Sequence, residues 1–294
     1  MVSYPQLIAQ QQAKLPVLIK PALPIPSQFD DSTHKLWRCE TEQGSLILKV
    51  CDHDNVQKSA FWQGMNSLFD ADFPRSLRNI ATTYNKIAEE GILTVPRFIA
   101  AEGDSHVLAE WLEGDAIVAE DVTDFMVIQL AQHLGKLHSQ IQSNWGPMHQ
   151  AKLDAEQWSS RLYKTIQNLA DNSSATIPNN VMTLCLHQAE AIKVEQFVPI
   201  MVDLRWDQFL QKNKQLTALV DLDAFVYGPK GLELVLLEYL LNAEQAALFK
   251  QHYQHNIELV DLNPIRKTYR LLLFLMNVLG ETDLDAWFSR SAVL

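Results

Sequence analysis

The sequence is poor in glycine and lacks the short motifs of several large enzyme classes. Only ten glycines are spread over its 294 residues. There is no G-x-x-x-x-G-K-S/T phosphate loop and no G-x-G-x-x-G turn, so neither a P-loop fold nor a dinucleotide-binding fold is indicated. The H-E-x-x-H motif of zinc proteases and the G-x-S-x-G motif of hydrolases are absent as well. Any enzymatic activity must therefore rest on other residues.

Cysteine is also scarce. Cys39, Cys51 and Cys185 are odd in number and widely spaced, which excludes a disulfide framework and a metal knuckle and is typical of a reducing compartment. The first residues show no basic segment followed by an apolar core, so no signal peptide is predicted. The most apolar late run, residues 268–280, is shorter than the roughly 20 residues that span a bilayer. We therefore expect a cytoplasmic protein without a membrane segment.

Positive charge is in deficit, with a formal net charge of -11 and a pI near 5.2. Nucleic-acid surfaces neutralise phosphates with lysine and arginine, so this balance argues against a nucleic-acid partner. A neutral or cationic small molecule fits an acidic surface better. With 47% hydrophobic residues, the chain is long enough for two lobes that each bury a core.

A β-hairpin is predicted early in the chain. Residues 35–40 and 45–52 alternate in polarity around a short turn that contains a glycine. On the second strand, Lys49 shares a face with Ile47 and Cys51, so a lysine points the same way as apolar neighbours. This placement is unusual for a solvent-exposed lysine.

The pattern then changes from strands to helices. A helix over 73–90 should end at Gly91, and two short strands surround the turn at 102–105. The remainder is mainly helical, with one embedded acidic hairpin, over the segments 121–140, 155–169, 181–194, 232–253 and 264 onward. This order predicts an α+β fold of two lobes, an N-terminal lobe over 1–113 and a C-terminal lobe over 114–294.

The acidic hairpin at Pro199–Tyr227 is the most informative stretch. Its two apolar strands deliver Asp203 on one side and Asp221 with Asp223 on the other, and Gln208 lies between them. A catalytic base with a set of magnesium ligands needs carboxylate and amide oxygens in one small volume. The alternative is that all three acids are turn formers at strand ends, where aspartate is common.

From about Leu36 to Tyr239, the order of elements resembles the aminoglycoside phosphotransferase and choline kinase-like family, which has the protein-kinase-like fold. In that family a loop of the type H-G-D-L-x-x-x-N precedes a strand that ends in I-D-F or I-D-W. Asp203 matches the loop aspartate, and Met201 and Val202 stand where histidine and glycine are usual. Further along, Gln208 falls at the asparagine position and Asp221 at the metal-binding aspartate.

The resemblance implies a role for each of these residues. Asp203 would accept the proton of the substrate hydroxyl, and Asp221 and Gln208 would hold magnesium against the phosphates of ATP. Asp223 would be a second metal ligand or would cap the following turn. The longer side chain of Gln208 moves its oxygen by roughly an ångström relative to asparagine. Glu233 would brace the catalytic loop, and His138 is interpreted as structural.

Lys49 resembles the strand lysine that contacts the α- and β-phosphates, and its alternative is a snorkelling edge-strand lysine. The family places an acidic partner for it on the following helix, where this sequence offers no central acid. Adenine would bind the segment that joins the lobes, through the backbone of Glu110, Trp111 and Leu112, unless this is an ordinary strand and loop. Glu89 and Glu90 lie only at the far end of the helix that follows Lys49, and Asp70 and Asp72 lie before its start. One of these aspartates would pair with Lys49, or the lysine is held by other residues.

The function predicted from the sequence is an ATP- and magnesium-dependent phosphotransferase that acts on a hydroxyl of a small metabolite or aminoglycoside-like molecule. The alternatives are a catalytically degenerate relative that binds nucleotide or a partner without transfer, and a scaffold that binds no nucleotide. A cationic substrate would lie against the C-terminal helices, facing Asp207, Glu258 and Asp261. The sequence does not indicate an oligomeric state.

Overall fold

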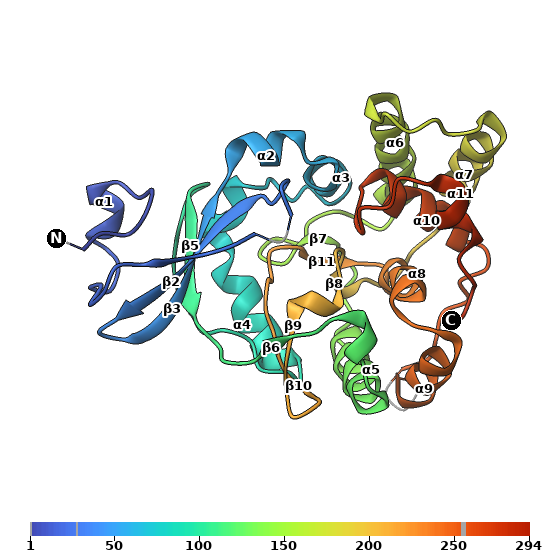
Figure 1. Ribbon diagram of the computed structural model, residues 1–294. Coiled ribbons are helices and arrows are strands. Elements are labelled where there is room, and N and C mark those ends of the chain that lie inside the picture. The colour runs from blue at the N-terminus through green and yellow to red at the C-terminus, as the bar shows by residue number, and fades with distance from the viewer. Residues whose placement is uncertain (1, 28, 254–256) are drawn as a thin grey trace.

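A computed structural model describes residues 2–27, 29–253 and 257–294. The chain folds into a sheet-rich N-terminal lobe and a larger, mainly helical C-terminal lobe, which lie on the left and right of Figure 1. The α+β architecture predicted from the sequence is confirmed. None of the helices in the described residues has the length and apolar character needed to cross a membrane.

The N-terminal lobe is built on a five-stranded antiparallel sheet in the order β1-β2-β3-β5-β4. The predicted hairpin is β2 with β3, and its turn ends at Gly44, whose φ of +106° suits glycine. A short helix, α1 (Ala9–Gln12), precedes the sheet. The strands are β1 (Leu23–Ile25), β2 (His34–Thr41), β3 (Gly44–Cys51), β4 (Phe98–Glu102) and β5 (His106–Glu110).

Strand β3 separates two hydrophobic clusters. Leu46 and Leu48 pack on the outer face of the sheet against Tyr4 and Leu7 of the N-terminal segment. On the opposite face, Cys51 belongs to the main core, which continues through the C-terminal lobe. This confirms the alternation predicted from the sequence, and it places Lys49 on the inner face.

Two helices that the sequence did not reveal follow β3. They are α2 (His53–Lys58) and α3 (Ala60–Phe69), and each begins at a side-chain cap, because Asp52 accepts from Asn55 N and Ser59 accepts from Trp62 N. The helix predicted over 73–90 is instead a 3-10 turn, η1 (Arg75–Asn79), followed by α4 (Ala81–Glu90).

Helix α3 connects the two lobes. Ser67 Oγ lies 2.8 Å from Thr165 Oγ1 of α6, and Arg161 of α6 donates to the carbonyls of Ser67 and Leu68 at 2.7 and 2.8 Å. These bonds satisfy two of the carbonyls that a helix end leaves without an intrahelical partner. The segment from α2 to η1 therefore bridges the lobes at one end of their junction, at the top centre of Figure 1.

The C-terminal lobe contains the predicted helices with modest shifts at their ends. The predicted helix over 232–253 is two helices, α8 and α9, separated at Leu241 and Asn242. A 3-10 turn, η2 (Ala119–Asp121), lies before the first helix of this lobe, α5. The helices are α5 (Asp124–His138), α6 (Gln157–Asn172), α7 (Asn179–Ala191), α8 (Lys230–Leu240), α9 (Ala243–Tyr253), α10 (Arg266–Leu275) and α11 (Leu284–Ser289).

The predicted single acidic hairpin is wrong in its pairing. The first strand breaks after Met201, and residues 202–208 form a loop with a 3-10 turn. Strand β8 therefore pairs with β11 and, separately, β9 pairs with β10. The short strands β6 and β7 extend these two sheets. The elements are β6 (Asp115–Ala116), β7 (Gly146–Pro147), β8 (Val198–Met201), η3 (Trp206–Gln208), β9 (Phe209–Lys212), β10 (Gln215–Leu219) and β11 (Phe225–Gly228).

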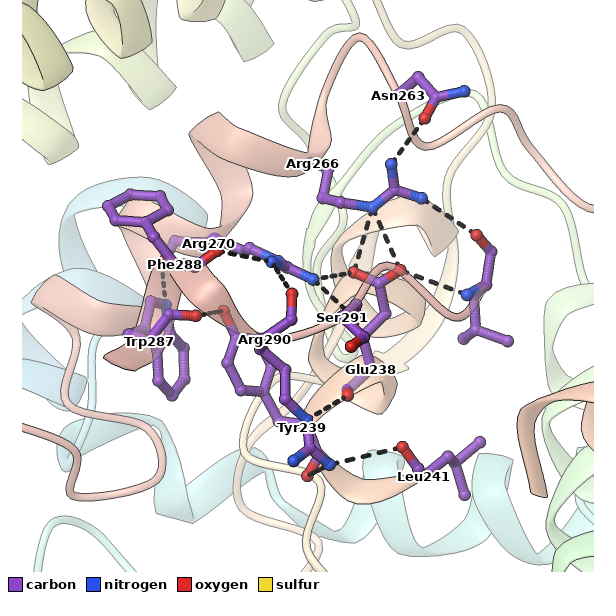
Figure 2. A network of polar contacts seen from close by, with 11 residues as sticks. Glu238, Tyr239, Leu241, Asn263, Arg266, Arg270, Trp287, Phe288, Arg290 and Ser291 are labelled. Carbon is purple, nitrogen blue, oxygen red and sulfur yellow. Dashed lines mark hydrogen bonds and ion pairs between the residues drawn. The ribbon is translucent and has the colours of Figure 1, made fainter. Parts of the chain in front are cut away.

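A buried ionic network fixes α10 to α8. Glu238 is fully buried and accepts from Arg266 Nε at 3.1 Å and from Arg270 Nη2 at 2.7 Å (Figure 2). Arg290 donates to the carbonyls of Glu238 and Tyr239. A buried carboxylate needs such pairing to offset the loss of hydration, so this network serves the packing of the helices.

Candidate active site at the junction of the lobes

The three predicted acids lie on two loops that meet beneath the N-terminal sheet. Asp203 follows β8, while Asp221 and Asp223 lie between β10 and β11. Because β8 pairs with β11, the ends of these loops are held side by side. Asp221 has a φ of +64°, a conformation that aspartate tolerates better than most residues and that is common at functional sites.

Lys49 joins these loops to the other lobe. Its Nζ lies 2.5 Å from Asp221 Oδ1 and 2.5 Å from Asp223 Oδ2. The side chains of Lys49 and Asp223 are 8% and 4% exposed, whereas that of Asp221 is 44% exposed. The lysine is therefore not a snorkelling edge-strand residue, because its ammonium group is buried between two carboxylates.

The ion pairs control the protonation of the cluster. Burial alone would lower the pKa of Lys49, but Asp221 and Asp223 raise it well above its ordinary value. Burial would likewise raise the pKa of Asp221, and the adjacent ammonium of Lys49 instead lowers it to about 2. Lys49 and Asp221 are thus both charged at neutral pH.

Asp203 has a different environment. One oxygen, Oδ2, accepts from Gln208 Nε2 at 2.9 Å, and the other is buried with no hydrogen-bond partner among the described residues. Burial, followed by the negative charge of Asp221, raises the pKa of Asp203 to about 7. A carboxyl group with a pKa near the operating pH is suited to general acid–base catalysis.

Both ends of the Gln208 amide are hydrogen-bonded within the loop that carries Asp203. Its Oε1 accepts from Arg205 N at 3.1 Å, while its Nε2 faces Asp203. The amide oxygen that would bind a metal is therefore already occupied by the backbone, and a metal role for Gln208 requires the amide to turn. Arg205 itself pairs with Asp207 at 3.2 Å.

Two residues of the site carry no clear signal in the sequence. His34 Nε2 lies 3.8 Å from Asp223 Oδ2 at the start of β2, and burial, together with the charge of Lys49, lowers the pKa of His34 to about 4. Tyr84 is buried in the middle of α4 and lies close enough to Lys49 for their charges to interact. An aromatic residue thus lies on the helix that was expected to carry an acid.

Neither of the aspartates considered as partners of Lys49 contacts it, so the alternative that Lys49 is held by other residues is the one the structure supports. Asp70 pairs with Lys152 at 3.3 Å, and Asp72 lies 3.9 Å from Arg75. The carboxylates that contact Lys49 come instead from the C-terminal lobe. Helix α4 carries acids only in its last two residues, Glu89 and Glu90, and Glu90 is partly buried.

The predicted adenine segment continues the sheet. Glu110 N donates to Arg97 O at 2.9 Å, and Trp111 N donates to Ser45 O at 3.0 Å. Those two N–H groups are used in strand pairing, which leaves the carbonyl groups and the backbone of Leu112 for an adenine. Contact between this segment and a nucleotide stays a prediction.

A buried chain of polar groups, which includes Glu233, holds the backbone that enters the loop of Asp203. Glu233 Oε1 accepts from Met201 N at 2.7 Å, and its Oε2 lies 2.6 Å from His138 Nε2. His138 Nδ1 in turn lies 2.8 Å from the hydroxyl of Tyr253. All these side chains are fully buried, so the backbone entering the loop is held from α5, α8 and α9.

The acids expected to face a cationic substrate do not form a cluster around a common point in the contacts of the described residues. Asp207 is engaged by Arg205, and Glu258 and Asp261 are exposed on the segment that leads to α10. The placement of a cationic substrate there stays a prediction.

A divalent metal would find limited support from protein groups alone. In the part of the chain that the structure describes, no three His, Cys, Asp or Glu side chains are grouped closely enough to hold a metal ion. Magnesium in phosphoryl-transfer sites usually takes one or two carboxylates and completes its shell with phosphates and water. Asp221 and Asp223 meet at one ammonium group, and Asp223 keeps an unpartnered, buried Oδ1. This donor set fits magnesium that arrives with a nucleotide.

Comparison with known proteins identifies the fold. No protein-family model matches the sequence, and no curated protein matches it either. Solved structures do match. A type I macrolide 2'-phosphotransferase superposes with a TM-score of 0.61 at 12% identity and covers 99% of this chain and 98% of its own. A macrolide 2'-phosphotransferase from Brachybacterium faecium superposes at 0.56, with 11% identity over 93% of this chain and 91% of its own.

A spectinomycin phosphotransferase, solved in complex with ADP and spectinomycin, superposes at 0.54 with 13% identity over 93% of this chain and 85% of its own. The agreement extends over both lobes. The chain therefore has the two-lobed, protein-kinase-like fold of small-molecule phosphotransferases, as the sequence resemblance predicted. Identities this low establish the fold and leave the reaction to be argued from the site.

Proposed function

We propose that this protein is an ATP- and magnesium-dependent phosphotransferase that phosphorylates a hydroxyl group of a small molecule. The observation that carries the proposal is that Lys49 of β3 is buried between Asp221 and Asp223, while Asp203 lies close enough to Asp221 for that negative charge to raise the pKa of Asp203. These groups come from three separate segments and from both lobes. Turn-forming aspartates have no reason to surround a buried ammonium group.

Each residue has a role that its environment supports. Asp203 accepts the proton of the substrate hydroxyl, since its pKa is raised and one of its oxygens is unpartnered. Asp221 and Asp223 are the ligands for magnesium, and Gln208 joins them if its amide turns. Lys49 would contact the phosphates, and Asp221 and Asp223, which it pairs with here, would be the residues that hold the magnesium ion. Bound magnesium would supply the neutralisation of phosphate charge.

Calorimetry with ATP, with and without magnesium, tests the proposal. Binding that requires magnesium and is lost in Asp221→Ala is expected, while Asp104→Ala, an exposed acid in the turn between β4 and β5, should bind as the wild type does. A ligand at 100 times Kd stabilises a protein by about 2.7 kcal/mol, so thermal shift offers an independent readout. No binding in either assay would refute a nucleotide site.

A second candidate, nucleotide binding without transfer, is favoured by one feature of the loop. Gln208 Oε1 is held by Arg205 N, and Met201 with Val202 replaces the usual residues before Asp203. The two functions differ in turnover. Wild-type ADP formation with hydroxyl acceptors such as macrolides or aminoglycosides, lost in Asp203→Asn while ATP binding persists, supports the phosphotransferase. Binding with no turnover for any acceptor supports the alternative.

A further inference from the structure

A cavity lies between the α3–η1 segment and the loop that follows β7, away from Asp203. Its volume is about 540 Å³, which is within the range of about 300–1,000 Å³ for small-molecule sites. Cavities between lobes are a frequent position for such sites. The lining residues are Asn66, Asp70, Asp72, Ser76, Arg78, Asn79, Pro147, His149, Gln150 and Lys152.

This cavity is distinct from the proposed phosphoryl-transfer site, because its lining includes neither Asp203 nor Lys49. A narrower cavity of about 30 Å³ continues inward from it, since the two share four lining residues. The narrow cavity reaches Asp223, whose Oδ1 is buried without a hydrogen-bond partner within the described residues. A ligand in the large cavity would thus lie one shell of residues from the proposed metal site.

The charges on the cavity wall are balanced but incompletely paired. Lys152 Nζ and Asp70 Oδ2 neutralise each other at 3.3 Å. Asp72 has only a distant contact, with Arg75 at 3.9 Å, and its side chain is 60% exposed. Arg78 donates its Nε to the carbonyl of Arg75, and no ion pair is found for it in the described part of the chain. Asp72 is therefore held only by a long, solvent-exposed contact, and the guanidinium of Arg78 keeps N–H groups available, so both side chains can bind a ligand.

This balance selects among ligand chemistries. Because Asp70 and Lys152 neutralise each other, a simple anion would be attracted by Arg78 but opposed by Asp72, and a simple cation would meet the reverse arrangement. The wall offers amides and a hydroxyl but little apolar surface, which disfavours a hydrophobic ligand. A molecule with both charges, a carboxylate and an ammonium a few atoms apart, satisfies Asp72 and Arg78 at once.

We propose that this cavity binds a small zwitterionic metabolite of the amino-acid class, with its carboxylate on the guanidinium of Arg78 and its ammonium group on Asp72. Arginine is suited to planar carboxylates, to which it can donate two parallel hydrogen bonds. Asp72 is held in a left-handed conformation, φ +50°, in the turn between α3 and η1. Such backbone conformations in non-glycine residues are concentrated at ligand sites. The proposal does not depend on phosphoryl transfer.

The experiment is a thermal-shift screen of the full-length protein with the standard L-amino acids and glycine betaine, followed by calorimetry on any compound that stabilises it. The carboxamide of that compound lacks the negative charge, and its N-acetyl derivative lacks the positive charge. Each derivative should bind at least about tenfold more weakly than the zwitterion. Inorganic phosphate and glucose serve as purely anionic and neutral probes. If no zwitterion binds, or if phosphate or glucose binds more tightly than every zwitterion, the proposal is overturned.

Variants then locate the site. Arg78→Gln and Asp72→Asn should each weaken binding about tenfold, and asparagine tolerates the backbone conformation at position 72. Lys58→Gln is the control, because Lys58 is an exposed basic residue of α2 that does not line the cavity. Unchanged affinity in both test variants would refute the assignment. Asp221→Ala should leave zwitterion binding intact, so failure here and failure of the nucleotide site are separable.

Discussion

Replacement of Lys49 by methionine measures whether this lysine is a buried ion-pair partner in solution. Its Nζ contacts Asp221 and Asp223, and the Lys49 and Asp223 side chains are 8% and 4% exposed. Removal of one partner of a buried ion pair leaves an uncompensated charge and costs about 3–5 kcal/mol. Solvent screens the contact with Asp221, whose side chain is 44% exposed. We therefore expect Lys49→Met to lower the free energy of unfolding by about 3 kcal/mol, the lower end of that range.

Urea denaturation of the wild type, Lys49→Met, Asp223→Asn and the double variant gives the answer as a thermodynamic cycle. The free energy of unfolding should fall less in the double variant than the sum of the losses in the two single variants, and the difference, which is the coupling energy, should be about 1–3 kcal/mol. Lys35→Met is the matched control, because Lys35 is 56% exposed and pairs with Asp52 at the surface, and it should cost less than about 1 kcal/mol. A Lys49→Met loss of similar size to the control, and additive with Asp223→Asn, would refute the buried pair.

Three further predictions concern the buried polar groups. Glu233→Ala removes the acceptor of Met201 N, so the free energy of unfolding measured with urea should fall by about 2–3 kcal/mol. The variant should lose more turnover than ATP affinity, because Glu233 supports the loop of Asp203. Equal effects on turnover and on affinity would count against this supporting role. Burial lowers the pKa of His133 from 6.5 to about 4, so the unfolded chain takes up a proton that the folded chain resists as pH falls. Stability should fall by roughly 2 kcal/mol between pH 7 and pH 5 through this group, and an unchanged pH profile in His133→Gln would contradict it. Glu238→Gln leaves the buried Arg270 and the partly buried Arg266 without their carboxylate and should lower the free energy of unfolding by about 3–5 kcal/mol. A comparable loss in the exposed control Glu190→Gln would show that the burial of the network is not the cause.

The regular parts of the fold could be predicted because their signals are local. The alternation of β2 and β3 and the 3.6-residue periodicity of α5 are visible within a single window of sequence. Helices α2 and α3 were missed because they are short and depend on the caps at Asp52 and Ser59 and on packing against α6. The break between β8 and β9 was missed because apolar residues at alternate positions, Val202, Leu204 and Trp206, continue a strand-like pattern through the loop.

The site was only partly predictable from sequence. The acids were identified by their spacing, but the partner of Lys49 was sought on the nearest helix, and the structure places it 172 and 174 residues away along the chain. No local pattern reports a contact of that sequence separation. His34 and Tyr84 were not found for the same reason, because each is an unremarkable residue until the fold brings it to the lysine.

The charges of the site explain why magnesium decides the test of function. The carboxylates of Asp221 and Asp223 share the ammonium group of Lys49, whereas the cation that acts on the nearby Asp203 is Arg205. The phosphates of a nucleotide would add negative charge to this volume, where partial burial strengthens repulsion. Lys49 can exchange its carboxylates for a phosphate only if another cation binds them, and a divalent ion with a preference for oxygen ligands meets that need. If ATP binds equally well without magnesium, Lys49 has not been displaced, and the acids are not a phosphoryl-transfer centre.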